Sequence, residues 1–172
     1  MGSYNFPDYA DDDEDYEKPF RFGTTVDKEF LKSGSNKYPL ISYNYIDLGD
    51  TEYHFSQDCF DNLDLLSYFK QLKKFSNLLF RNLMDNSSHH DHFKIEPKVG
   101  PKIKRLLEKV YKKPLTEKTT PLVGHFALYT NPESARDTKI KSPRIFFILG
   151  KRATIHILFY DPYHEIHGRS AK

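Results

Sequence analysis

"RIFFILGKRATIHILFYD", residues 144–161, decides the fold of this chain. Two apolar runs, 144–150 and 153–161, stand on either side of the short polar pair Lys151-Arg152. Both runs are apolar at odd and even positions alike, which is typical of strands buried on both faces of a sheet. We therefore predict a central β-hairpin, in a sheet that helices cover on at least one side.

Within the second of these strands, alternation divides the side chains between the two faces of the sheet. Since every second residue points to the same face, Phe159 is predicted to share a face with Ile155. Tyr160 is then predicted to lie on the opposite face, together with His156.

Two helices are predicted upstream of this hairpin. Apolar residues recur every three or four positions from Phe60 to Leu83, which predicts one amphipathic helix of about seven turns. A second helix is predicted to begin at Pro101, a residue favoured in the first turn, and to end at Pro114.

The remaining elements are predicted to be strands, and together they indicate the fold class. Residues 39–56 are typical of a hairpin that turns at Gly49-Asp50, and residues 122–130 of a further strand. Strands, two helices and strands again predict an α+β fold, an antiparallel sheet packed against two helices. We assign a single domain to residues 37–172, after an acidic, disordered tail and linker at 1–36.

The charges are distributed unevenly along the chain. The formal net charge is +2, yet residues 1–19 contain a single base, Lys18, and the rest of the chain is basic. Such a tail is ordinarily a solvated leader. It could also fold back on the basic body, or bind a separate basic protein partner, and the sequence leaves these alternatives open. Its acidic side chains are Asp8, Asp11, Asp12, Asp13, Glu14, Asp15 and Glu17.

Basic residues concentrate on the second predicted helix, and this pattern favours RNA or the ribosome as a partner. Lysine and arginine clusters bind phosphates without reading the base sequence. The alternative is an ordinary solvated helix face. The candidate nucleic-acid contacts are Lys102, Lys104, Arg105, Lys109, Lys112, Lys113 and, in the hairpin turn, Arg152.

Several other classes of protein are disfavoured. The histidines of "HHDHF", residues 89–93, lie too close together to chelate one ion easily, so we predict neither a metal site nor a cofactor. No apolar run is long enough to span a membrane. The lone Cys59 and the lack of secretory signal features favour a cytoplasmic protein.

The C-terminal stretch is the best candidate for chemistry. Tyr163 and His164 follow the last strand, and Arg144 opens its hairpin partner, which brings a guanidinium close to both. Histidine transfers protons near neutral pH, and arginine binds phosphate in a bidentate manner. The alternative is a plain turn at Asp161-Pro162.

The order of elements resembles that of the RelE/ParE superfamily of bacterial toxins. Two helices are followed by a sheet whose penultimate strand begins with an arginine and whose last strand ends in a tail with His and Tyr. The matching region is roughly 60–165 and includes "SPRIFFILGKRATIHILFYDPYH". The resemblance implies an endoribonuclease of the toxin–antitoxin type that cuts mRNA without a metal. It implies that Arg144 contacts the phosphate, that Tyr163 and His164 are catalytic, and that Glu96 is a base.

The sequence therefore predicts a toxin-like RNA-binding protein or ribonuclease. A non-catalytic interaction protein, an inhibitor or an antitoxin-like partner, remains the alternative. It would use the acidic aromatic tail of residues 1–19 and the basic body to bind a protein or a nucleic acid.

Overall fold

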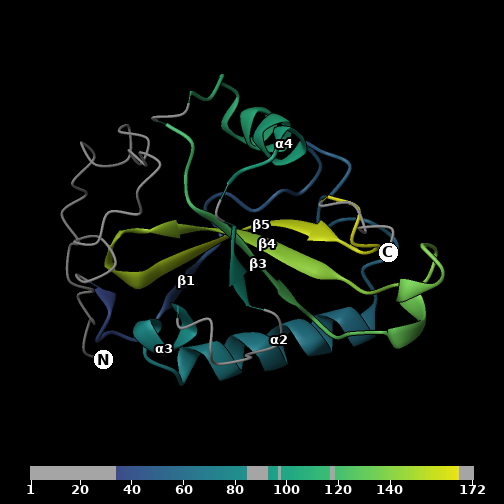
Figure 1. The fold of residues 1–172 in the computed structure, drawn as a ribbon, viewed down its shortest axis with the longest axis horizontal. Coiled ribbons are helices and arrows are strands. Elements are labelled where there is room, and N and C mark those ends of the chain that lie inside the picture. The colour runs from purple at the N-terminus through teal and green to yellow at the C-terminus, as the bar shows by residue number, and fades with distance from the viewer. Residues whose placement is uncertain (1–33, 85–92, 97, 117–118, 167–172) are drawn as a thin grey trace, which may run out of the picture.

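The computed structural model describes residues 34–84, 93–96, 98–116 and 119–166, and these residues form an α+β fold. A five-stranded sheet has the order β1-β5-β4-β3-β2, and helices lie against both of its faces (Figure 1). The strands are β1 (Leu40–Ser42), β2 (Lys94–Ile95), β3 (Val123–Ala127), β4 (Arg144–Gly150) and β5 (Thr154–Asp161). The helices are α2 (Asn62–Ser76), α3 (Phe80–Met84) and α4 (Pro101–Tyr111). Short 3-10 turns span Pro132–Ala135 and Lys151–Ala153.

The predicted central hairpin and the second predicted helix are confirmed. β4 and β5 pair antiparallel from Arg144–Asp161 to Gly150–Thr154, and β4 is buried along its whole length. Helix α4 begins at Pro101 and ends at Tyr111, and the next residue, Lys112, caps it with a left-handed backbone conformation. Of the tail and linker predicted to be disordered at 1–36, residues 1–33 lie outside the described residues. Ser35 and Asn36 are described, and both accept hydrogen bonds from Arg81.

The sheet is mixed, and the predicted hairpin at 39–56 is wrong. β1 pairs in parallel with β5, in the register Leu40–Thr154. The chain then turns at Asp47, whose side chain accepts hydrogen bonds from the backbone N–H groups of Gly49 and Asp50. Two isolated backbone hydrogen bonds hold the segment after β1 beside β5 without forming a strand. The Asp47 N–H donates to the Leu158 carbonyl, and the Tyr160 N–H donates to the Tyr53 carbonyl.

A β-bulge in β5 overturns the predicted division of its side chains. Phe147 pairs with Ile157 while Phe146 pairs with Phe159, so Leu158 is an extra residue in β5. The extra residue shifts the alternation by one position. Phe159 therefore packs on the α4 side of the sheet, and Tyr160 packs on the α2 side.

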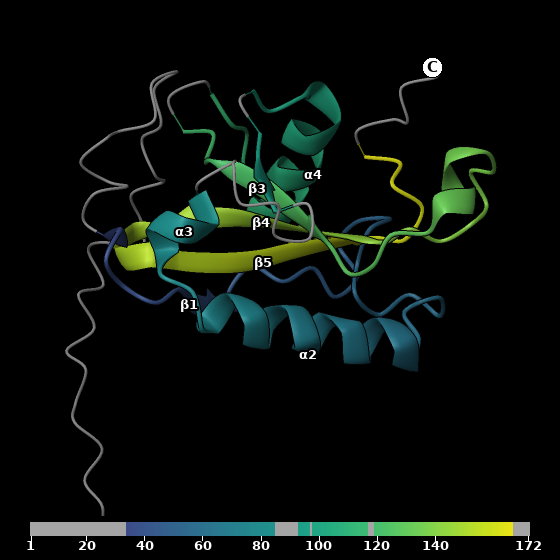
Figure 2. The same cartoon turned by 60° about the horizontal axis from the view of Figure 1, so that its bottom comes forward.

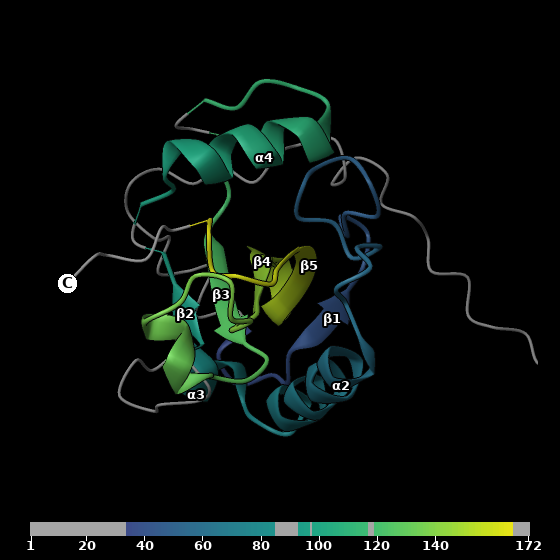
Figure 3. The ribbon, with the colours of Figure 1, turned by 90° about the vertical axis from the view of Figure 1, so that its right-hand side faces the viewer.

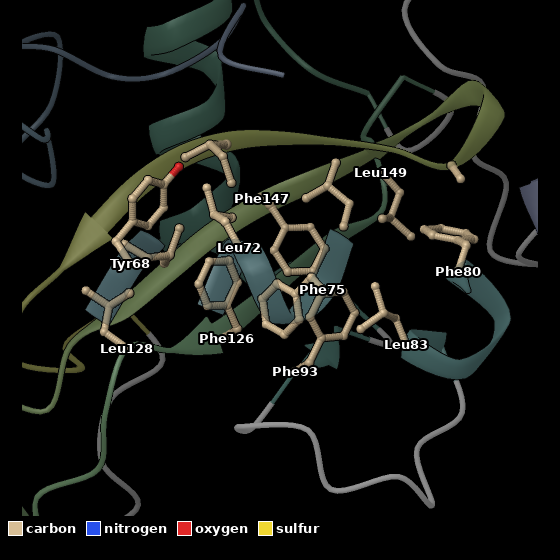
Figure 4. Packing of buried hydrophobic residues seen from close by; sticks show 14 of the residues in the cluster. Tyr68, Leu72, Phe75, Phe80, Leu83, Phe93, Phe126, Leu128, Phe147 and Leu149 are labelled. Carbon is tan, nitrogen blue, oxygen red and sulfur yellow. The ribbon is translucent and has the colours of Figure 1, made fainter. Parts of the chain in front are cut away.

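Two separate cores fill the two faces of the sheet. The end-on view in Figure 3 shows α4 on one side of the sheet and α2 and α3 on the other. Between the sheet and the pair α2 and α3, aromatic rings from helix and strand meet edge to face, for example Phe75 with Phe126 (Figure 4). On the other face, Ile103, Leu106 and Leu107 of α4 cover Phe146 and Ile148. No helix among the described residues is long and apolar enough to cross a membrane.

The single helix predicted from Phe60 to Leu83 is divided into α2 and α3, and it faces the sheet differently from the prediction. Asp61 caps α2 by accepting hydrogen bonds from the backbone N–H groups of Leu63 and Asp64. Residues spaced by three drift around a helix of 3.6 residues per turn, so the apolar series winds from one side to the other. The buried side chains of α2 are Asp64, Tyr68, Leu72 and Phe75, while Leu63, Leu66 and Phe69 face outward.

Candidate functional site

The candidate site lies at the end of the sheet where β4 begins and β5 ends. Arg144 and Asp161 stand opposite each other in the strand pairing, which places Arg144 at the base of the C-terminal turn as predicted. Arg144 is buried, however, and its Nη1 donates to the carbonyl oxygens of Ser142 and Pro143 at 3.0 and 3.2 Å. This guanidinium stabilises the loop that enters β4. Its contact with a phosphate remains a prediction that these contacts do not favour.

Asp161 shapes the turn that carries the predicted catalytic residues. Its two carboxylate oxygens accept the backbone N–H groups of Glu165 and Ile166, at 2.9 and 2.8 Å. Burial raises the pKa of Asp161, while these two hydrogen bonds act to lower it. The turn fixed in this way holds His164 in a left-handed conformation, with φ of 57°.

The structure brings Glu96 and His164 together through a residue that the sequence reasoning missed, His125 of β3. Nδ1 of His125 lies 2.8 Å from Oε1 of Glu96, and the His125 ring centroid lies 6.3 Å from that of His164. The side chains of His125 and Glu96 are only 8% and 16% exposed. A histidine within the apolar run 122–130 was the available signal.

Glu96 reaches this position because β2 pairs closely with β3. Lys94 pairs with His125, and the backbone N–H of Glu96 donates to the Val123 carbonyl at 2.8 Å. Gly124 permits this approach, since a Cβ there would lie 2.4 Å from the Phe147 ring and 2.6 Å from the Lys94 carbonyl.

Lys102 ties the first turn of α4 to the C-terminal turn. Its Nζ donates to the Tyr53 hydroxyl at 2.6 Å and to the Glu165 carbonyl at 3.1 Å. The Tyr53 hydroxyl in turn donates to the Glu165 carboxylate at 3.2 Å. Of the predicted nucleic-acid contacts, Lys102 is therefore joined directly to the segment that carries Tyr163 and His164.

Most of the other predicted cations are engaged with acidic residues. Glu52 lies 3.5 Å from Arg105 and 3.4 Å from Lys109, in ion pairs between exposed side chains. Two pairs at 4.0 Å join Lys112 to Asp50 and Lys104 to Glu108. These acids reduce the positive field that α4 presents to a polyanion.

The last two predicted cations lie away from the C-terminal turn. Lys113 follows the end of α4, where its backbone N–H donates to the Glu108 carbonyl. Arg152 lies in the turn between β4 and β5, at the opposite end of these strands from Asp161. The seven predicted nucleic-acid contacts therefore do not gather around His164.

A second cluster of buried polar groups lies on the α2 side of the sheet. Asp64 is fully buried and accepts hydrogen bonds from the hydroxyls of Tyr129 and Tyr160 and from Nζ of Lys141, at 2.9, 2.5 and 2.5 Å. Burial acts to lower the pKa of Lys141, but its bonds to Asp64 and Asp61 outweigh burial and raise that pKa. This cluster fixes the loop before β4 to the start of α2.

No group of three or more metal-binding side chains is found within the described residues. The histidines of residues 89–92, considered above as metal ligands, lie outside those residues.

The comparisons with known proteins assign no function to the Glu96–His125–His164 cluster. No family model matches this chain, and no curated protein or solved structure matches it.

Proposed function

We propose that the protein cleaves RNA by general acid–base catalysis, with Glu96, His125 and His164 as the reacting and orienting groups. The observation that carries the proposal is the contact of 2.8 Å between Glu96 and Nδ1 of His125, with the His164 ring 6.3 Å from the His125 ring. A carboxylate that orients one imidazole beside a second imidazole is an arrangement suited to moving protons at neutral pH.

Each group has a defined part in the proposed reaction. The Glu96 carboxylate, with its Oε1 2.8 Å from Nδ1 of His125, stabilises the positive charge that this imidazole gains when it takes up a proton. Nε2 removes the proton of the ribose 2′-hydroxyl, and the oxygen attacks the adjacent phosphorus. The bond from phosphorus to the 5′ oxygen breaks, and His164 donates the proton that the leaving oxygen takes up. The products are a 2′,3′-cyclic phosphate and a 5′-hydroxyl, and the reaction requires no metal.

Two neighbours extend this assignment. Lys102, held at the same turn by Tyr53 and Glu165, supplies positive charge for the phosphate in place of the buried Arg144. Tyr163, next to His164, is the second candidate for the proton donor. The chemistry is that implied by the RelE/ParE resemblance, with His125 added as the base. A single cysteine fits a cytoplasmic site of action.

The test is cleavage of a short RNA by the purified full chain, alone and on ribosomes, with the products analysed for a 2′,3′-cyclic end. His125→Asn, His164→Asn and Glu96→Gln should each lower the rate by about 10²- to 10⁴-fold. His54→Gln is the matched control, because His54 belongs to the segment that runs beside β5 and not to the Glu96–His125–His164 cluster.

Three results would count against the proposal. Intact RNA with wild-type protein, both alone and on ribosomes, would refute the activity. Cleavage of a substrate with a 2′-deoxy sugar at the scissile position would refute the mechanism. Full activity in the histidine variants would refute the site assignment.

A non-catalytic interaction protein is the second candidate, and two observations favour it. The cations of α4 are paired with Glu52 and Asp50, which weakens the case for a polyanion. Large apolar side chains of α2 are exposed instead. In that case the purified protein would leave RNA intact and would bind a protein partner through the exposed face of α2.

A further inference from the structure

Among the helices of the described residues, α2 presents the most apolar exposed face. Leu63, Leu66 and Phe69 are 58%, 53% and 57% exposed, and Leu65 borders them. They follow one another at intervals of three residues, on the half of α2 turned away from the buried Asp64, Tyr68 and Phe75. A cluster of this size on a surface helix is typical of an interaction site.

The second half of the same face is basic. Lys70, Lys73 and Lys74 are exposed and continue the line begun by the leucines and Phe69. Within the described residues, neither Lys70 nor Lys73 makes an ion pair, in contrast to the cations of α4. Read from its N-terminus, α2 thus offers an apolar surface followed by a basic one.

The N-terminal segment of this chain has the complementary composition in the same order. Tyr4, Phe6 and Tyr9 come first, and the acidic run Asp11–Asp15 and Glu17 follow. We propose that residues 4–17 dock along the outward face of α2, parallel to it. The aromatic rings cover the leucines and Phe69, and the carboxylates lie over the three lysines.

The path of the chain permits this arrangement. The first described residues lie beside α3, where the N–H groups of Phe80 and Arg81 donate to the carbonyls of Lys37 and Ser35. Because α3 follows α2 directly, the N-terminal segment joins the domain near the basic end of α2 (Figure 2). Helix α2 is about 22 Å long at 1.5 Å per residue. In a parallel arrangement Glu17 lies near the same end of α2 as Gly34, and the stretch between them spans up to about 55 Å when extended, so it is long enough to connect the two.

Docking on α2 is independent of the proposed ribonuclease site, because Glu96, His125 and α4 belong to the other face of the sheet. It also sharpens the general idea that the tail covers the basic body. Lys70 and Lys73 of α2 lie next to an apolar surface, whereas Arg105, Lys109 and Lys112 have acidic partners. The tail needs both features of α2, since it carries aromatic and acidic residues together.

Paramagnetic relaxation on the full chain tests the proposal. A nitroxide is attached at Ser3→Cys in a Cys59→Ser background, and amide broadening is measured at α2 and α4. We expect strong broadening over residues 63–70, little over α4, and a loss of broadening as salt rises to 0.5 M. The triple variant Lys70→Glu, Lys73→Glu, Lys74→Glu should abolish it. The matched charge reversal on α4 (Lys104→Glu, Lys112→Glu, Lys113→Glu) should leave it unchanged.

Equal broadening at α2 and α4 would overturn the proposal, and so would broadening that survives the α2 charge reversal. Samples that mix spin-labelled chains with unlabelled, ¹⁵N-enriched chains identify a different occupant. If broadening appears as strongly between chains as within one, a second copy covers α2, and the intramolecular assignment is wrong. Circular dichroism of each variant verifies that the helices are retained, as expected for substitutions at exposed positions.

Discussion

The two long helices on opposite faces of the sheet are held in opposite ways. Helix α4 buries one apolar stripe, and Arg105, Lys109 and Lys112 pair with acids of the loop at residues 50–52. Helix α2 is anchored by the buried carboxylate of Asp64 and leaves Leu63, Leu66 and Phe69 exposed. Among the described residues, the outward face of α4 is therefore largely paired with acids, whereas the outward face of α2 leaves large apolar side chains exposed. Four changes test this contrast.

Asp64→Ala should have the largest effect, because it removes the acceptor shared by Lys141, Tyr129 and Tyr160. Removing one partner of a buried charge pair costs about 3–5 kcal/mol, and Lys141 would keep only its ion pair with the exposed Asp61. Urea unfolding followed by circular dichroism should show a midpoint far below that of the wild type. A loss of less than about 1 kcal/mol would mean that Asp64 does not anchor α2.

Acid should weaken the α4 side of the protein through His156. Burial lowers the pKa of His156 to about 4, whereas an unfolded histidine titrates near its usual value of 6.5. Between these values the unfolded chain binds a proton that the folded chain excludes, so stability falls as pH drops from about 6.5 to 4. The slope contributed by one group is at most about 1.4 kcal/mol per pH unit.

The readout for His156 is the urea midpoint across this pH range, in wild type and in His156→Gln. The variant should have a flatter profile. His156 lies against Tyr45, whose ring contacts Tyr111 of α4, and it lies 2.8 Å from the Ser42 hydroxyl. Near-ultraviolet circular dichroism should therefore register the loss of tyrosine packing as the pH is lowered. Identical profiles for the two proteins would assign the acid sensitivity to other groups.

Glu52→Gln should change stability by less than about 1 kcal/mol, because its pairs with Arg105 and Lys109 are exposed and screened. The same change releases two cations on α4. If this helix binds a nucleic-acid backbone, RNA affinity at low salt should rise several-fold, as fluorescence anisotropy would show. If the affinity for RNA were unchanged in this variant, α4 would not be the surface that binds RNA.

Leu66→Ser should have the smallest effect on folding, within about 0.5 kcal/mol, because the side chain is already exposed. Leu72→Ser, from the buried side of the same helix, is the matched control and should lower the unfolding midpoint strongly. A comparable loss for both would show that the outward face of α2 is covered as tightly as the inward face.

The features that the sequence predicted correctly depend on local patterns. The hairpin at 144–161 is apolar on both faces, and α4 starts at a proline, so both could be recognised without knowledge of distant partners. The parallel pairing of β1 could not, because Leu40 and Thr154 are far apart in the chain and no local signal joins them. The bulge at Leu158 likewise leaves the apolar pattern of β5 unchanged while it exchanges the faces of Phe159 and Tyr160.

The candidate site was predicted in part for the same reason. Glu96 and His164 were selected from the sequence, and the structure places both beside His125. His125 itself was missed, because a histidine in a buried strand ordinarily packs as part of the core. Its contact with Glu96 depends on the register in which β2 pairs with β3, a tertiary property. Arg144 was placed correctly beside the C-terminal turn, but its burial was not foreseen.

Because β1 pairs with β5, the first strand of the sheet meets its partner only after the helices and strands between them have been synthesised. Ser42 and His156, which touch at this pairing, are separated by 114 positions. Ribosomes add about 5–20 residues per second, so the emerging N-terminal half waits roughly 5–25 s for β5. During that interval the apolar inner side of α2 lacks its contacts with β5. Exposed apolar surface of this kind promotes aggregation, which chaperones or rapid folding would limit.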